Sequence, residues 1–101
     1  PNAVADSDDH PVPADFQLRA YPNPFNRSVT IRFTLDRPGE LQWHIVNIMG
    51  REVYHTDNSF PAGTHTVTWT PDSALSGGIY FIQLQSSAGA RKQIRKIVYL
   101  K

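Results

Sequence analysis

The sequence has 101 residues, a formal net charge of +1 at pH 7 and no cysteine. This length allows one domain with a single core. The lack of cysteine excludes disulfide bonds, thiolate metal sites and a cysteine nucleophile. Apolar residues make up 40% of the chain, but no run of them approaches the ~18 residues that a membrane-spanning helix needs, so no transmembrane segment is predicted.

Residues 1–15 are rich in Ala, Asp, Ser and Pro and contain few large apolar side chains. Such a segment cannot bury enough apolar surface to offset the entropy lost on ordering. We therefore predict a flexible acidic linker over residues 1–15 and one β-domain over residues 16–101. The run Asp6-Ser7-Asp8-Asp9-His10 resembles half of a calcium-binding loop, but it lacks the glycine and the distal glutamate of such loops, so no metal site is predicted.

Alternation of apolar and polar residues predicts strands along the rest of the chain. The clearest case is residues 29–35, where Val29, Ile31 and Phe33 alternate with polar neighbours. Further strands are expected over residues 16–20, 41–45, 52–55, 64–70, 79–84 and 92–100. Turns containing Pro or Gly separate the strands roughly every 8–12 residues, a spacing typical of sandwiches and barrels. The sequence predicts an all-β fold, an antiparallel immunoglobulin-like β-sandwich of about seven strands without a convincing helix.

The apolar positions of these strands define the expected core. Tyr80 follows a glycine pair at the start of a late strand, where the hydroxyl of a tyrosine corner would bond to nearby backbone. Gly50 and Gly78 are expected to meet backbone requirements, either φ > 0 or a close approach of another chain segment. The expected core consists of Leu18, Val29, Ile31, Phe33, Leu41, Trp43, Ile45, Val53, Val67, Trp69, Tyr80, Ile82, Leu84, Ile94 and Val98.

Catalytic chemistry is not indicated by any motif. The histidines are His10, His44, His55 and His65, and no pair of them has the spacing of a helical metal site, so we interpret them as surface or strand-face residues. The carboxylates of the domain fall in turns or at strand ends, and no nucleophile elbow frames a serine. The sequence therefore predicts no enzyme, no catalytic, cofactor-binding or metal-binding residues and no cofactor.

Two other binding functions are compatible with part of the sequence. Exposed aromatic residues would suit a carbohydrate-binding module of a polysaccharide hydrolase, but Trp43 and Trp69 lie on apolar strand faces and are assigned to the core. Tyr54 and Tyr99 are freer and stay candidates for sugar stacking. No nucleic-acid partner is predicted, because the charge is nearly balanced and the basic residues form one short stripe. A structural immunoglobulin-like spacer is the third possibility.

Five short motifs follow one another in a characteristic order. They are Tyr21-Pro22-Asn23-Pro24-Phe25-Asn26, the Ile45-Val46-Asn47-Ile48-Met49-Gly50-Arg51-Glu52-Val53 turn, Pro61-Ala62-Gly63 with Val67, Leu75-Ser76-Gly77-Gly78-Ile79-Tyr80-Phe81, and the final Arg95-Lys96-Ile97-Val98-Tyr99-Leu100-Lys101. Together they resemble the C-terminal sorting domain of the type IX (Por) secretion system of Gram-negative bacteria. The resemblance covers residues 21–101.

The resemblance implies a non-catalytic secretion signal and cell-surface attachment module at the end of a larger secreted protein. The cargo domain would lie N-terminal to the module and would travel through the periplasm to the outer-membrane cell surface. The partners implied are the outer-membrane secretion translocon and sortase-like processing machinery. Processing would be expected to cut the chain within residues 1–15.

The final strand is the expected contact with that machinery. An edge strand can pair its backbone with a partner strand, and its basic side chains can enter an acidic groove. The predicted contact residues are Arg95, Lys96, Ile97, Val98, Leu100 and Lys101. Pro22 and Pro24 are interpreted mainly as architectural, because each fixes φ and removes a backbone donor, and Asn23 is expected to cap the turn between them.

Overall fold

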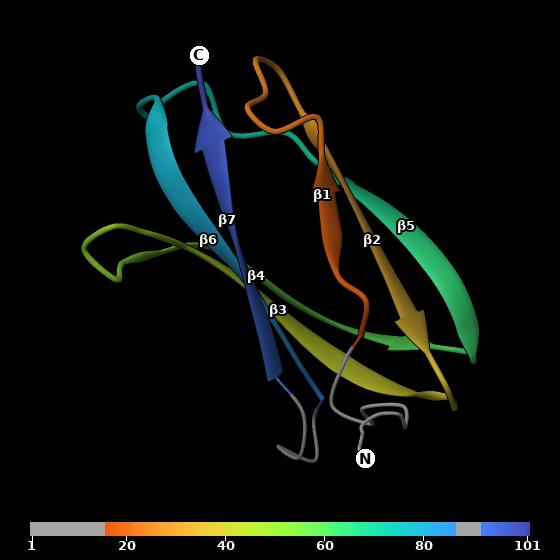
Figure 1. Cartoon of the computed structure of the whole chain (residues 1–101). Coiled ribbons are helices and arrows are strands. Elements are labelled where there is room, and N and C mark those ends of the chain that lie inside the picture. The colour runs from red at the N-terminus through yellow and green to blue at the C-terminus, as the bar shows by residue number, and fades with distance from the viewer. Residues whose placement is uncertain (1–15, 87–91) are drawn as a thin grey trace, which may run out of the picture.

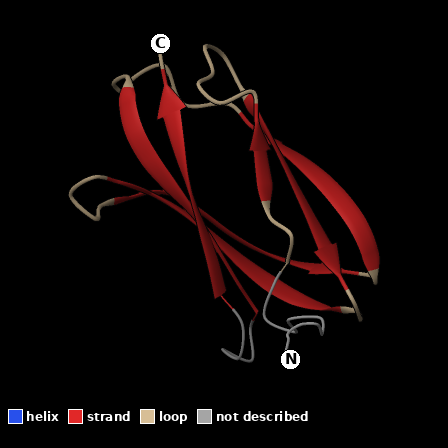
Figure 2. Ribbon diagram, in the orientation of Figure 1, coloured by secondary structure: helices blue, strands red, loops and turns tan. Residues whose placement is uncertain are grey.

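The computed structural model describes residues 16–86 and 92–101, and every regular element in these ranges is a strand (Figure 1, Figure 2). The predicted linker over residues 1–15 lies outside the described residues. The strands are β1 (Arg19–Tyr21), β2 (Val29–Leu35), β3 (Gly39–Asn47), β4 (Glu52–Phe60), β5 (Gly63–Trp69), β6 (Gly78–Ser86) and β7 (Lys92–Tyr99). Within the described part of the chain, no helix is long and apolar enough to cross a membrane.

The strands form two sheets with the orders β1-β2-β5 and β4-β3-β6-β7, and all neighbouring strands are antiparallel. The predicted all-β sandwich of about seven strands is confirmed. The chain changes sheet between β2 and β3, between β4 and β5, and again between β5 and β6. As a result β1 and β7, near the two ends of the chain, lie side by side at one edge of the sandwich (Figure 1).

The core lies between the sheets, and the alternation of each strand determines which side chains enter it. In β2 the odd-numbered positions from Val29 to Leu35 are buried, whereas Arg32 is exposed on the outer face. Phe33 lies at the centre of an aromatic group. Its ring centroid is 5.1 Å from that of Trp43, 5.0 Å from that of Phe60 and 5.5 Å from that of His65. Rings at these separations add to the energy of area burial through edge-to-face contacts.

The phase predicted for the last strand is wrong. Ile94 is 44% exposed and Val98 is only partly buried, whereas Ile97 and Tyr99 are buried. The inward-facing positions of β7 therefore have odd numbers, and two of them carry the polar side chains of Gln93 and Arg95. Sequence analysis also missed the buried residues Phe16 and Phe25, which lie outside the strands, and overestimated Val53 and Val67, which are partly buried.

Two tight turns depend on glycine and on side-chain hydrogen bonds. At the β3–β4 turn, Gly50 has a φ of 80°, and the Asn47 side-chain oxygen accepts hydrogen bonds from the backbone N–H groups of Met49 and Arg51, both at 2.9 Å. Gly78, the first residue of β6, has a φ of 146°. The Tyr80 hydroxyl then donates to the Ser76 carbonyl at 2.6 Å, which is a tyrosine-corner arrangement.

Candidate functional site

β7 is an edge strand of the four-stranded sheet, with β6 on one side. Edge strands usually present unpaired N–H and C=O groups that can pair with another chain. Here the outer edge of β7 lies along residues 16–25, a segment that includes β1 and the residues on either side of it. We call this line of contact, between residues 16–25 and residues 93–100, the β7 seam.

The upper half of the β7 seam is formed by Asn23 and Phe25. The Asn23 side chain imitates a strand partner, since its Nδ2 donates to the Lys96 carbonyl and its Oδ1 accepts from the Val98 N–H, both at 2.9 Å. The backbone of Phe25 continues the pairing as a parallel bridge. Its N–H donates to the Val98 carbonyl at 2.9 Å, and its carbonyl accepts from the Leu100 N–H at 2.8 Å.

The lower half of the β7 seam uses side chains of β7 instead. The Gln93 Oε1 atom accepts from the N–H groups of Phe16 and Leu18, at 3.2 and 3.1 Å, and the Arg95 Nε donates to the Leu18 carbonyl at 3.0 Å. These bonds satisfy the backbone groups of Phe16 and Leu18, which precede β1. They also give the two inward-facing polar residues of β7 partners, so the strand can turn its polar end toward the other sheet.

The last residue of the sequence is fixed to the loop before β6. The Lys101 ammonium donates to the carbonyls of Ser73 and Leu75, both at 2.8 Å. Gly77 permits this approach, because a Cβ atom at that position would lie 3.1 Å from the Tyr99 carbonyl oxygen. The close approach that sequence analysis considered for Gly78 therefore belongs to its neighbour.

The predicted contact residues divide into an exposed and a buried group. Arg95, Lys96, Leu100 and Lys101 are exposed, Val98 is partly buried, and the Ile97 side chain is fully buried in the core. The backbone of β7 differs from the free edge that sequence analysis expected. Asn23 and Phe25 already occupy the Lys96 carbonyl, both backbone groups of Val98 and the Leu100 N–H.

Replacing Asn23 by alanine is expected to weaken the β7 seam. The loss of two hydrogen bonds to the strand should lower the free energy of unfolding by about 1–3 kcal/mol. In hydrogen-exchange measurements the Val98 amide should lose protection. Asn23→Asp is the matched variant, because it keeps the acceptor for the Val98 N–H and loses the donor to the Lys96 carbonyl. Equal Val98 protection in wild type and Asn23→Ala would contradict the pairing role.

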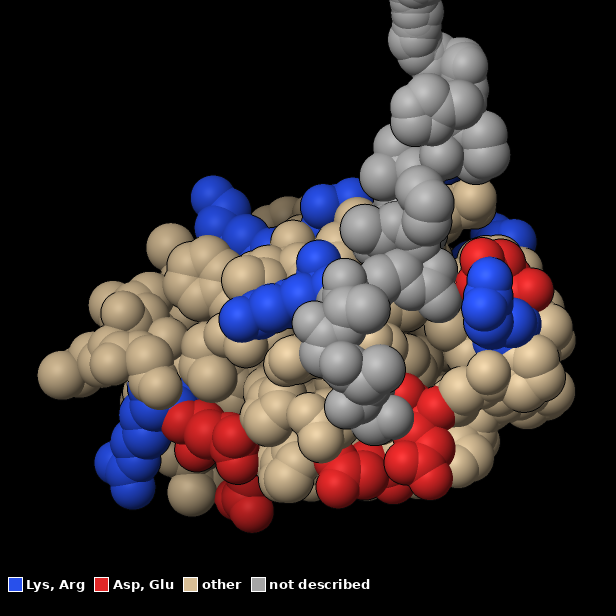
Figure 3. All heavy atoms as spheres, turned by 90° about the horizontal axis from the view of Figure 1, so that it is seen from below, with Lys and Arg blue, Asp and Glu red and all other residues tan. Residues whose placement is uncertain are grey.

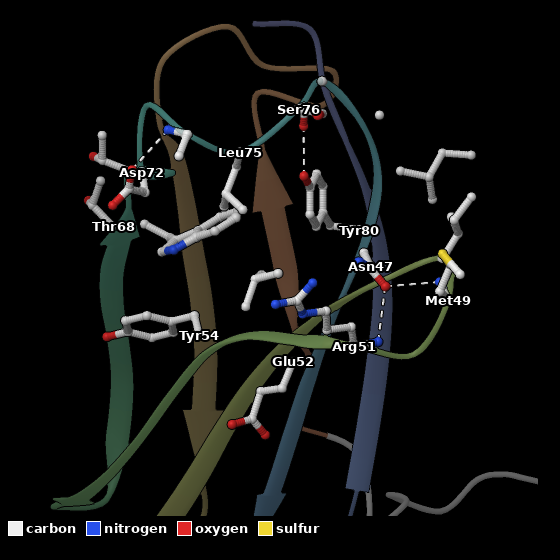
Figure 4. A pocket seen from close by; sticks show the side chains of 18 residues that line it. Asn47, Met49, Arg51, Glu52, Tyr54, Thr68, Asp72, Leu75, Ser76 and Tyr80 are labelled. Carbon is white, nitrogen blue, oxygen red and sulfur yellow. Dashed lines mark hydrogen bonds between the residues drawn. The ribbon is translucent and has the colours of Figure 1, made fainter.

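A separate cleft of about 980 Å³ lies at the opposite edge of the sandwich, between the start of β4 and the end of β5 (Figure 4). Tyr54 and the β3–β4 turn form one side of it, and the loop that carries Leu75 forms the other. Ile48 and Met49 at the turn are exposed apolar residues. Tyr80 also lines the cleft, and its hydroxyl donates to the Ser76 carbonyl.

The histidines of β3 and β4 form an exposed polar cluster. The rings of His44 and His55 stack with centroids 4.6 Å apart. The Glu52 carboxylate contacts both rings, at 2.8 Å from His44 Nδ1 and 3.9 Å from His55 Nδ1. His55 also contacts Asp57 at 3.1 Å. No group of three or more potential metal ligands occurs in the described ranges, and His10 lies outside them.

Comparison with known families relates these motifs to one group of proteins. The family model of the secretion system C-terminal sorting domain matches residues 19–100, a range that includes both sides of the upper β7 seam. The chain belongs to this family. The sorting domain is thus a non-catalytic secretion signal module of secreted proteins, and membership implies interaction with the type IX machinery and secretion to the cell surface.

One solved structure supports the fold of the sorting domain. PorZ of Porphyromonas gingivalis, described as an essential bacterial surface component of the type-IX secretion system, superposes with a TM-score of 0.64 and 20% identity over 83% of this chain and 11% of that chain. A β-glucosidase from Listeria innocua in complex with laminaribiose has a TM-score of 0.46 and 16% identity over 83% and 16% of the two chains. The sorting domain therefore spans a small part of each protein. No curated protein matches its sequence significantly.

Proposed function

We propose that the sorting domain delivers a larger cargo to the outer-membrane cell surface and that the export machinery grips the β7 seam. One observation carries the proposal. Two family motifs that are more than 70 residues apart in the sequence meet there, since Asn23 bonds to Lys96 and Val98 across separations of 73 and 75 residues. A recognition element built from both motifs is present only when the sandwich has closed.

Recognition begins at the side chains of the β7 seam. Arg95 and Lys96 are exposed cations, and Leu100 is an exposed apolar residue, so an outer-membrane translocon can contact them without unfolding the sandwich. Pairing with the β7 backbone is a second step. A partner strand would replace the hydrogen bonds made by Asn23 and Phe25 with bonds of the same type, so the exchange is nearly neutral in hydrogen bonding.

Processing by sortase-like machinery and attachment to the surface follow from a cut within residues 1–15. Phe16 is buried and its N–H is bonded to Gln93, so the folded sandwich protects the chain at this residue. We therefore expect the cut to fall before Phe16 and not at it. Such a cut separates the cargo from an intact sorting domain.

The exposure of the aromatic residues favours sorting over carbohydrate binding. Trp43, Trp69 and Tyr80 are buried, and Tyr99 is only 7% exposed, so the expectation that Tyr99 is free to stack on a sugar is wrong. Its ring instead stacks on Phe25 at 5.2 Å. Among the described residues, Tyr21 in β1 and Tyr54 in β4 are exposed, but these strands belong to different sheets, so the two rings do not form the aromatic row that a carbohydrate-binding module needs.

The basic residues are also unlike those of a nucleic-acid binder. On the face seen from below, Lys and Arg side chains lie in separate groups, and Asp and Glu side chains lie beside some of these groups (Figure 3). The described residues on this face provide no continuous basic surface for a phosphate backbone.

The proposal predicts that the domain alone is sufficient as a secretion signal when it is fused to another protein. A periplasmic reporter enzyme with the 101-residue chain at its C-terminus, produced in a bacterium with type IX secretion, should appear on the cell surface. The same reporter fused to an unrelated immunoglobulin-like sandwich should stay in the periplasm. Protease accessibility of the reporter on intact cells gives the readout. Equal display of both fusions would reduce the domain to a structural spacer.

A further inference from the structure

A second cleft, of about 690 Å³, lies on the lower part of the β7 seam, between β1 and β7. Its walls carry four cationic side chains, and its lining residues include neither Asp nor Glu. Arg19 and Arg32 come from the three-stranded sheet, and Arg95 and Lys96 come from β7. We call this the basic cleft.

The charges of the basic cleft are not compensated within the described part of the chain. Arg19 and Arg32 are direct cross-strand partners on the outer face of β1 and β2. Like charges at opposed positions destabilise a sheet. Glu52 and Asp57, which contact histidines, lie on β4 of the other sheet and do not line the basic cleft. The domain thus keeps an arrangement that is unfavourable for folding alone and favourable for binding an anion.

The cleft is partly organised before any ligand arrives. The Arg95 guanidinium is held by its Nε bond to the Leu18 carbonyl, which fixes the plane of the group. A pre-oriented guanidinium loses less side-chain entropy when it binds a carboxylate. Asn23, which also lines the cleft, is fixed by its bonds to β7.

We propose that the basic cleft binds an extended, carboxylate-rich segment of a partner protein. The inference rests on the proposed function, because it names the chemistry of the partner that grips the β7 seam. The cations come from both walls of the cleft, and the Arg95 Nε atom is already bonded to the backbone. Alternate side chains of an extended peptide are about 7 Å apart, which suits separate pairing with several cations.

The test uses the complete 101-residue chain and a synthetic peptide with glutamate at alternate positions. Isothermal titration calorimetry at low salt should detect binding that weakens as salt is added. The double variant Arg19→Gln/Arg32→Gln should bind at least tenfold more weakly, with an unchanged melting temperature or a higher one. Arg51→Gln is the matched control, since this arginine lies at the other cleft, and it should bind as wild type does.

Four results would overturn the inference. The first three are the absence of peptide binding, an equal loss in the Arg51→Gln control, and displacement of the peptide by inorganic phosphate at a comparable concentration. A tenfold gain in affinity for the variant Asp6→Asn/Asp8→Asn/Asp9→Asn would also overturn it, because the chain's own acidic residues would then be the occupant. Reporter export is measured separately, so a domain that is exported but binds no peptide would refute the cleft and leave the sorting function intact.

Discussion

Deleting residues 96–101 from the full-length cargo protein is expected to trap that protein in the periplasm. The deletion removes the upper half of the β7 seam, the buried side chains of Ile97 and Tyr99, and the exposed charges of Lys96 and Lys101. Loss of surface signal with accumulation of cargo in the periplasmic fraction is the measurement. Normal surface display of the truncated protein would rule out the proposed recognition of the β7 seam by the export machinery.

Two full-length variants separate folding from recognition in this experiment. Ile97→Ala removes a side chain with no exposed surface and should lower the free energy of unfolding by about 2–5 kcal/mol. Lys96→Ala/Leu100→Ala removes two exposed side chains and should leave stability within about 0.5 kcal/mol of wild type. If the machinery reads the surface of β7, the second variant loses export although it stays folded. Export lost only in Ile97→Ala would mean that the machinery requires the fold and not these side chains.

Phe33→Ala is expected to cause the largest loss of stability by a single substitution. The side chain is fully buried between the sheets and contacts the rings of Trp43 and Phe60 from different strands. Removing it should reduce the free energy of unfolding by about 3–5 kcal/mol, through lost burial and the cavity left behind. Since domains of this size are stable by roughly 5–15 kcal/mol, the variant would lose much of its margin.

Chemical denaturation followed by tryptophan fluorescence measures this effect, because Trp43 reports on the same contact. Phe33→Leu keeps most of the buried volume and should lose less than half as much stability. Thr34→Ala is the control on the neighbouring residue, whose hydroxyl bonds to that of Thr64 near the surface. A Phe33→Ala midpoint close to that of Thr34→Ala would show that the inter-sheet aromatic group is not the centre of the core.

The sandwich could be predicted from the sequence because most strands bury one face only. In β2 and β3, apolar residues occupy every second position, and the predicted core residues of both strands are buried. A period of two is then sufficient to define the inward face. The turns were equally readable, since Gly50 adopts a positive φ that other residues rarely adopt.

The last strand shows where local pattern fails. Ile94, Ile97 and Val98 do not share a face, so the apolar residues of β7 support either phase. The structure selects the phase in which Gln93 bonds to the backbone N–H groups of Phe16 and Leu18, and Arg95 bonds to the Leu18 carbonyl. Those partners are 75 to 77 residues away, so the residue pattern of β7 alone does not predict these bonds. The apolar residues Ile97 and Tyr99, at alternate positions of the strand, could have indicated which face of β7 points inward.

The parts of the candidate site were selected from the sequence, but the contact between them was not predicted. Sequence analysis selected Asn23 and the final strand separately, one as a turn residue and the other as a contact. In the structure the Asn23 side chain reaches across to the strand, and the two selections become one surface. The basic cleft was missed, because Arg19 and Arg32 face each other only through the register of β1 and β2.

The β7 seam also sets the order of events during synthesis. Residues 16–25 leave the ribosome long before residues 93–100, and their closing partners do not exist until that last stretch has been translated. Contacts between such distant parts of a chain form slowly and late. The nascent domain therefore stays open until its final strand is available, and the sandwich closes only when residues 93–100 reach residues 16–25.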